Sequence, residues 1–118
     1  MSRQIYSRAA NVIANHVPAA NTAAVVTIAA DANHVWDIRA VYASYTAAPT
    51  NGSLDISIGG VSKYNVPVTN SGIVGKNGIL FALGDEEDGL HGTYNQAVVV
   101  TLAAGGVGIN GAVNVLYR

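Results

Sequence analysis

The sequence predicts an all-β protein, an antiparallel β-sandwich or its jelly-roll variant, with about seven strands. Apolar and polar residues alternate with a period of two in several short segments, as in strands that bury one face. Links rich in glycine, asparagine, serine and threonine separate these segments, and no convincing long helix follows residue 20. We therefore expect a β-sandwich domain over residues 21–118, preceded by an N-terminal arm over residues 1–20.

The N-terminal twenty residues lack clear strand alternation. An apolar stripe at helical spacing is present, formed by Ile5, Ala9, Val12, His16 and Val17. Asparagines and Pro18 weaken this stripe, so an extended arm stays the alternative to a helix. The arm also contains charged and apolar side chains that suit docking onto a partner, namely Arg3, Ile5, Tyr6 and Arg8. We predict that the arm becomes ordered only against a partner.

The first strands are predicted around Val25 to Ile28 and over residues 34–45, "HVWDIRAVYASY". Alternation in the second segment assigns one face to Asp37 and Arg39. It assigns the opposite, core face to Trp36, Ile38, Ala40 and Tyr42.

A tight hairpin is predicted next. Residues 53–58 and 61–68 both alternate, and Gly59-Gly60 between them supplies the positive φ that primed turns require. The core face should consist of Leu54, Ile56, Ile58, Tyr64, Val66 and Val68. Pro67 has no N–H to donate, which indicates an edge strand.

The remaining strands are predicted over residues 78–83, 96–104 and 112–118. The β-branched run over 96–104 suits a strand buried on both faces. "GGVGING" turns the chain before the last strand, in which Val113, Val115 and Tyr117 share a face. The predicted core contains Trp36, Ile38, Leu54, Ile56, Val98, Val100 and Val115.

Composition favours a protein that packs against neighbours. Hydrophobic residues make up 50% of the 118 residues, charged residues only 11%, and the net charge is −1. A typical domain has about 25% charged residues, so we expect self-association into a homo-oligomer. No basic tract favours nucleic acid and no apolar stretch is long enough for a membrane span. Without a signal-peptide pattern, we expect synthesis in the cytoplasm.

The segment "GDEEDGLHG", residues 84–92, is the one concentration of charge. Its four adjacent carboxylates belong to Asp85, Glu86, Glu87 and Asp88. Calcium loops place their acids at alternate positions and add a distal glutamate, and this segment does neither. We predict a polar loop at a contact with a neighbouring protein subunit and no metal site. A solvated loop, an ion pair with a basic neighbour and a hard-cation site are the alternatives.

Motifs for catalysis are not evident. His16, His34 and His91 are not at metal-ligand spacing, the chain has no cysteine, and no serine lies in a nucleophile elbow. "GGVGING" lies between strands and lacks the Lys-Ser/Thr pair of a phosphate loop. We predict no enzymatic activity and no cofactor. Several tyrosines would form a sugar-stacking surface if exposed, or otherwise belong to the core or an interface: Tyr42, Tyr45, Tyr64 and Tyr94.

Two stretches carry a resemblance, "HVWDIRAVYASYTAAPTNGSLDISIGG" and "GLHGTYNQAVVVTLAAGGVGINGAVNVLYR". Over residues 23–118 their layout resembles small β-sandwich structural proteins of tailed bacteriophages, of the capsid decoration or cement type. The resemblance implies an oligomeric shell protein, commonly trimeric, that lies between major capsid subunits on the exterior of the virion. It carries no catalytic residues.

The leading expectation is therefore a non-enzymatic viral structural protein that stabilises a phage head, assembled in the host cytoplasm. Its partners would be its own copies, as a trimer, and the major capsid protein. A carbohydrate- or receptor-binding sandwich of a phage fibre or tail is the alternative. A small hydrolase would need a convergent site that the sequence does not reveal.

Overall fold

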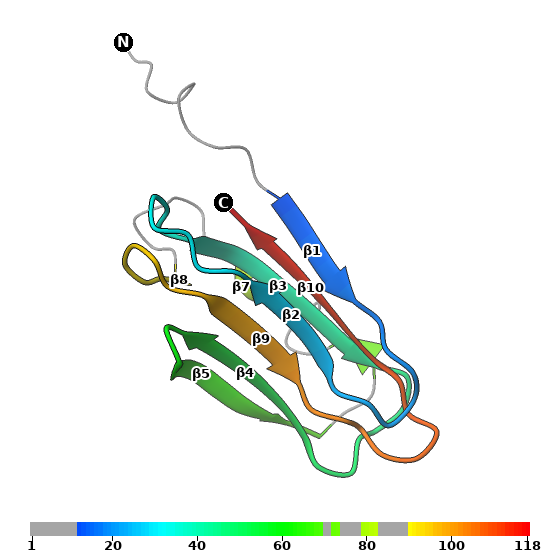
Figure 1. Ribbon diagram of the computed structural model, residues 1–118. Helices are drawn as coiled ribbons and strands as arrows, with labels where there is room; N and C mark the ends of the chain where they lie inside the picture. The colour runs from blue at the N-terminus through cyan, green and yellow to red at the C-terminus, as the bar shows by residue number, and fades with distance from the viewer. Residues whose placement is uncertain (1–11, 70–71, 74–78, 83–89) are drawn as a thin grey trace.

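The protein consists of two antiparallel sheets. The computed structural model describes residues 12–69, 72–73, 79–82 and 90–118, which contain no helix. One sheet has the order β1 (Val12–His16), β10 (Gly111–Tyr117), β3 (Asp37–Tyr45) and β6 (Gly72–Ile73), and β7 (Ile79–Ala82) and β8 (Leu90–His91) also pair with β3. The other has the order β2 (Ala24–Ile28), β9 (Val98–Leu102), β4 (Gly52–Ile58) and β5 (Val61–Val68). In Figure 1 the strands of both sheets run along one diagonal. The predicted antiparallel sandwich is confirmed.

The order of the strands is that of a jelly roll. β1 pairs with β10, β2 with β9 and β4 with β5, while β6, β7 and β8 occupy one interrupted position beside β3. The chain is thus one long antiparallel ribbon, rolled so that its successive pairs alternate between the two sheets. Every strand that the sequence predicts is present, and β1, β6 and β8 are additional.

The core lies between the sheets and is built from alternate residues of the strands. Among the predicted core residues, those without exposed surface are Ile38, Leu54, Ile56, Val98, Val100 and Val115. Trp36 differs from the prediction, because it precedes β3 and is only partly buried against the core. The prediction for β9 was also wrong in part. Val99 and Thr101 are half-buried, so only one face of this strand is fully covered.

A bulge in β3 changes which face each side chain takes. Leu116 of β10 pairs with Ala40 and Tyr117 pairs with Ile38, which leaves Arg39 as an extra residue. Beyond a one-residue bulge the alternation is shifted by one. Val41 and the odd-numbered residues after it therefore enter the core, and Tyr42 points outward with 40% of its surface exposed. The prediction that Tyr42 faces the core was wrong for this reason.

The hairpin between β4 and β5 follows the prediction. Gly59 and Gly60 have φ values of 62° and 84°, the left-handed region that a primed turn requires at both positions. Tyr64, Val66 and Val68 face the core, and β5 is the terminal strand of its sheet, as Pro67 indicated.

Asp55 of β4 links side chains of both strands on the outer face of this hairpin. Its Oδ2 accepts a hydrogen bond from Ser57 Oγ at 2.7 Å, and its Oδ1 accepts one from Asn65 Nδ2 at 3.1 Å and one from Ser62 Oγ. These donors favour the charged carboxylate, so they lower the pKa of Asp55 below its ordinary value of 3.8, with Ser62 as the largest contributor.

Because the pKa of Asp55 is lowered on folding, its contribution to stability is present above pH 3.8 and is lost as the pH falls through the folded-state value. We expect Ser62→Ala to raise this pKa toward 3.8, as measured by NMR titration of the carboxyl carbon. Asp31 is the internal control, because its low pKa has other donors. An unchanged Asp55 titration would show that Ser62 does not hold the carboxylate.

The N-terminal segment also departs from expectation. Residues 12–16, assigned to an arm, form strand β1 and pair in continuous register with β10, so this part is neither a helix nor outside the sandwich. Ala14 packs against the core, and His16 Nδ1 accepts the backbone N–H of Val25 at 2.9 Å. A helix this short is marginally stable in water without tertiary packing, whereas the strand is stabilised by pairing with β10 along its whole length. Residues 1–11 lie outside the described part of the chain.

Candidate interaction surfaces

The partner-contact residues predicted from the sequence lie outside the described residues. This applies to both predicted groups, Arg3, Ile5, Tyr6 and Arg8, and Asp85, Glu86, Glu87 and Asp88. Their roles, and the absence of a metal in the acidic loop, stay predictions.

The outer face of the six-stranded sheet carries an uncharged groove. Ile13 of β1 pairs with Leu116 of β10, and Tyr42 of β3 pairs with Asn114 of β10, so these four residues adjoin one another. Together with Val115 they line a groove of about 270 Å³, which we call the outer groove. Ile13 is 71% exposed and Tyr42 40%, although both are large and apolar. Exposed apolar surface of this kind is typical of a contact with another molecule.

Two features explain why the sequence does not predict the outer groove. Its lining comes from three strands that are distant along the chain, and the bulge at Arg39 turns Tyr42 outward. The signal for the bulge was present, because Ala40 and Val41 are adjacent apolar residues at which one alternating phase ends and another begins.

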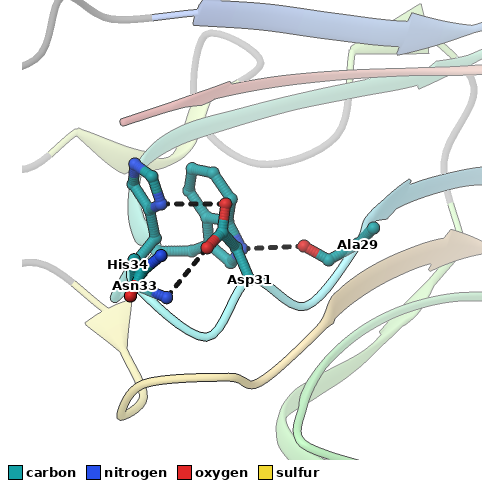
Figure 2. A network of polar contacts seen from close by, with 5 residues as sticks. Ala29, Asp31, Asn33 and His34 are labelled. Atoms are coloured by element: carbon teal, nitrogen blue, oxygen red, sulfur yellow. Dashed lines mark hydrogen bonds and ion pairs between the residues drawn. The ribbon is translucent and has the colours of Figure 1, made fainter.

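Aromatic side chains gather at one end of the sandwich. The rings of His34 and Trp36 are stacked, with centroids 5.0 Å apart and an interplanar angle of 10°. Tyr117 meets Trp36 edge-on, with centroids 5.6 Å apart. The indole N–H of Trp36 donates to the carbonyl of Ala29 at 3.0 Å, a contact drawn in Figure 2. We call these three rings the aromatic cluster.

Asp31 organises the turn that presents the aromatic cluster. Its Oδ1 accepts the backbone N–H of Asn33 at 2.8 Å, and its Oδ2 lies 3.0 Å from Nδ1 of His34 (Figure 2). The hydrogen bond from Asn33 and then that from His34 lower the pKa of Asp31. The carbonyl of Asp31 also accepts the N–H of Asn95, whose φ is 63°, so this turn is fastened to the loop before β9.

The tyrosines separate into core and surface. Tyr45 is 2% exposed, and its hydroxyl donates to the carbonyl of Ala103 at 2.6 Å. Tyr64 packs against the core, so neither residue offers a stacking surface. Tyr42 lies in the outer groove, and Tyr94, 65% exposed, is in the loop that Asn95 fastens to the Asp31 turn.

A buried ion-pair cluster lies where β3 begins and β10 ends. Asp37 and Arg118 exchange both backbone hydrogen bonds, at 2.8 and 3.0 Å. Asp37 Oδ2 lies 3.0 Å from Nη1 of Arg39 and 3.7 Å from Nε of Arg118. Arg39 has only 7% of its surface exposed. A buried guanidinium is tolerated only when paired, so we interpret this cluster as structural.

The histidines do not converge. His16 contacts β2, His34 belongs to the aromatic cluster, and His91 Nδ1 lies 3.2 Å from the carbonyl of Gly92. Within the described residues, no group of three or more histidine, aspartate or glutamate side chains is placed to hold a metal ion.

The described residues include no helix long and apolar enough to cross a membrane. Comparison of the chain with protein families, with curated proteins and with solved structures finds no match in any of the three.

Proposed function

We propose that this protein is a non-enzymatic structural protein of a bacteriophage head, which assembles with its own copies and binds between major capsid subunits. In this proposal it forms a trimer on the capsid exterior, after assembly in the host cytoplasm, and it needs no cofactor. The observation that carries the proposal is the outer groove, an uncharged and mostly apolar surface on a sheet face that the described residues leave exposed.

The physical argument begins with the lining of the outer groove. Ile13 and Leu116 are aliphatic, Tyr42 offers a ring and a hydroxyl, and Asn114 is polar but neutral. Removing the apolar part of this surface from water is favourable. Its neutral polar groups cost less free energy to desolvate than charged groups would. Aromatic residues are enriched and charged residues depleted in the centres of protein interfaces. The lining therefore favours a protein partner over an ionic ligand.

Composition and fold are compatible with this function. A chain with 11% charged residues has little charge repulsion to oppose close packing. Jelly rolls occur in both viral capsid and lectin domains, so the fold admits both functions considered for this chain. The choice between the capsid role and carbohydrate binding therefore depends on what the outer groove and the aromatic cluster bind.

The test uses one substitution in the outer groove. We expect Tyr42→Glu to weaken self-association, or attachment to heads from which this chain has been removed, at least about tenfold, equivalent to 1.4 kcal/mol. A charge placed in an interface must be desolvated, which opposes association. Val107→Glu is the matched control, because Val107 is 91% exposed in the loop before β10 and outside the groove. Sedimentation velocity and co-sedimentation measure the two effects.

Three results would contradict the proposal. A wild-type chain that stays monomeric at micromolar concentration and above would exclude self-association. Heads of the source phage that lose the chain when tails and fibres are removed would exclude the capsid role. Equal effects of Tyr42→Glu and Val107→Glu would exclude the outer groove as the contact.

The aromatic cluster favours a second candidate, carbohydrate binding by a fibre or tail protein. Sugar rings stack on aromatic faces, and His34, which is stacked on the Trp36 ring, lies beside the polar groups of the Asp31 turn. Trp36 is the one tryptophan of the chain, so tryptophan emission, excited selectively over the six tyrosines, reports on this site alone. A saturable change in emission with a panel of mono- and disaccharides, lost in His34→Ala, would favour this candidate. No change at millimolar sugar would argue against it.

A further inference from the structure

The sheet edges of this sandwich are protected unequally. Edge strands expose unpaired N–H and C=O groups, and natural proteins block them with lysine, proline, bulges or a covering segment. β5 carries Lys63 and Pro67, and its pairing with β4 contains a bulge. β2 is covered in part by β1, because the N–H of Val25 donates to His16. Both edges of the four-stranded sheet therefore carry a recognisable protection.

Among the described residues, β1 has none of these protections. Its sequence is VIANH, with no lysine, arginine, aspartate, glutamate or proline, and its register with β10 shows no bulge. Within the described chain, β1 pairs only with β10, so alternate residues direct their N–H and C=O groups away from the sheet. Ile13 of β1, with 71% of its surface exposed, lies on this edge strand.

We propose that β1 pairs with β1 of a second copy of this chain, antiparallel and around a two-fold axis at Ala14. The proposal deepens the proposed self-association and rests on it. A two-fold contact joins copies in pairs, so it is distinct from a three-fold contact and can connect neighbouring trimers.

The sequence of β1 suits pairing with itself. A two-fold axis at Ala14 places Ile13 opposite the second copy's Asn15 and Val12 opposite the second copy's His16. In an antiparallel pair with this axis normal to the sheet, each side chain stays on the face it already occupies. No pair of like charges is brought together, because β1 has no lysine, arginine, aspartate or glutamate.

The same axis joins the outer grooves of the two copies. Ile13 lies on the outer face between the open edge and Leu116, and its counterpart in the second copy becomes its diagonal neighbour. Diagonal neighbours in a sheet are about 7–8 Å apart, within reach of long side chains. The exposed isoleucines of the two copies would therefore cover each other, and the two apolar grooves would become one strip.

The strength of this contact follows from its size. β1 has five residues, so the paired edge is small beside an interface of standard size, about 1,600 Å² in total. We expect a micromolar or weaker pair in solution, and stronger pairing where an assembly holds copies close together.

Disulfide trapping tests the register. The chain has no cysteine, so Ile13→Cys and Asn15→Cys introduce single thiols into the exposed positions of β1. When the two full-length variants are mixed and mildly oxidised, we expect mixed disulfides to exceed both homodimers, because the axis at Ala14 places these positions directly opposite. Val61→Cys mixed with Val107→Cys is the control, since both positions are exposed and lie outside β1. Circular dichroism checks that each variant is folded.

The outcomes distinguish the contact from the function. Mixed disulfides no more abundant than in the control would overturn the β1 pairing. If wild-type chain still self-associated and Tyr42→Glu still weakened it, the proposed function would survive that result. Ile13→Lys gives a second readout, because two lysines across the axis repel. We expect it to weaken pairing at least tenfold in sedimentation equilibrium, and an effect no larger than that of Val61→Lys would also overturn the pairing.

Discussion

Ile56→Ala is expected to lower the free energy of unfolding by about 2–5 kcal/mol. Ile56 has no exposed surface and lies in β4, opposite Val100 of β9 on one side and Tyr64 of β5 on the other. The alanine would remove buried methylene and methyl groups and leave a cavity in the core between the two sheets, and the strands paired on both sides of β4 oppose its closure. Urea denaturation measures the loss.

Val61→Ala is the matched control for this core substitution. Val61 is also an aliphatic residue of the β4–β5 hairpin, but it is 57% exposed, so its truncation should change stability by less than about 0.5 kcal/mol. A loss below about 1 kcal/mol for Ile56→Ala would mean that the two sheets close together around the missing atoms, and that the core is less rigidly packed than its burial indicates.

Gly52→Val is expected to destabilise the protein by about 1–3 kcal/mol, although valine is a better strand residue than glycine. A Cβ atom at residue 52 would lie 2.6 Å from the carbonyl oxygen of Val68 and 2.7 Å from Cγ of Pro49. Val68 is the β5 partner of Gly52, so its carbonyl belongs to the sheet and cannot move independently. Overlap with backbone is relieved only by separating the strands where the hairpin ends.

Ser53→Val separates strand propensity from this overlap. Ser53 is the next residue of β4, half-buried and opposite Pro67, so the substitution brings the same strand preference to a position where glycine is not required. We expect its stability to stay within about 0.5 kcal/mol of wild type. If thermal unfolding shows Gly52→Val as stable as Ser53→Val, then the approach of Val68 to Gly52 is not a constraint on the fold.

The sequence by itself determined the fold class, the strands and most of the core. Alternation identified Leu54, Ile56 and Val115 as buried, because a strand with one covered face needs an apolar residue at every second position. Gly59-Gly60 identified the hairpin, because few other dipeptides adopt positive φ twice in succession. Alternation and turn formation depend on residues that are adjacent in the sequence, so they can be predicted from the sequence alone.

Only the tertiary structure decided how β1 is used and which residues form the outer groove. The weak apolar pattern over residues 12–16 is compatible with an arm, a helix or a strand, and β10, about a hundred residues later, supplies the hydrogen bonds that select the strand. The bulge at Arg39 arises in pairing with β10 and turns Tyr42 outward. Ile13, Tyr42 and Leu116 therefore adjoin one another through the strand topology. Antiparallel pairing brings together residues that are distant along the chain, and local sequence patterns do not reveal which strands pair.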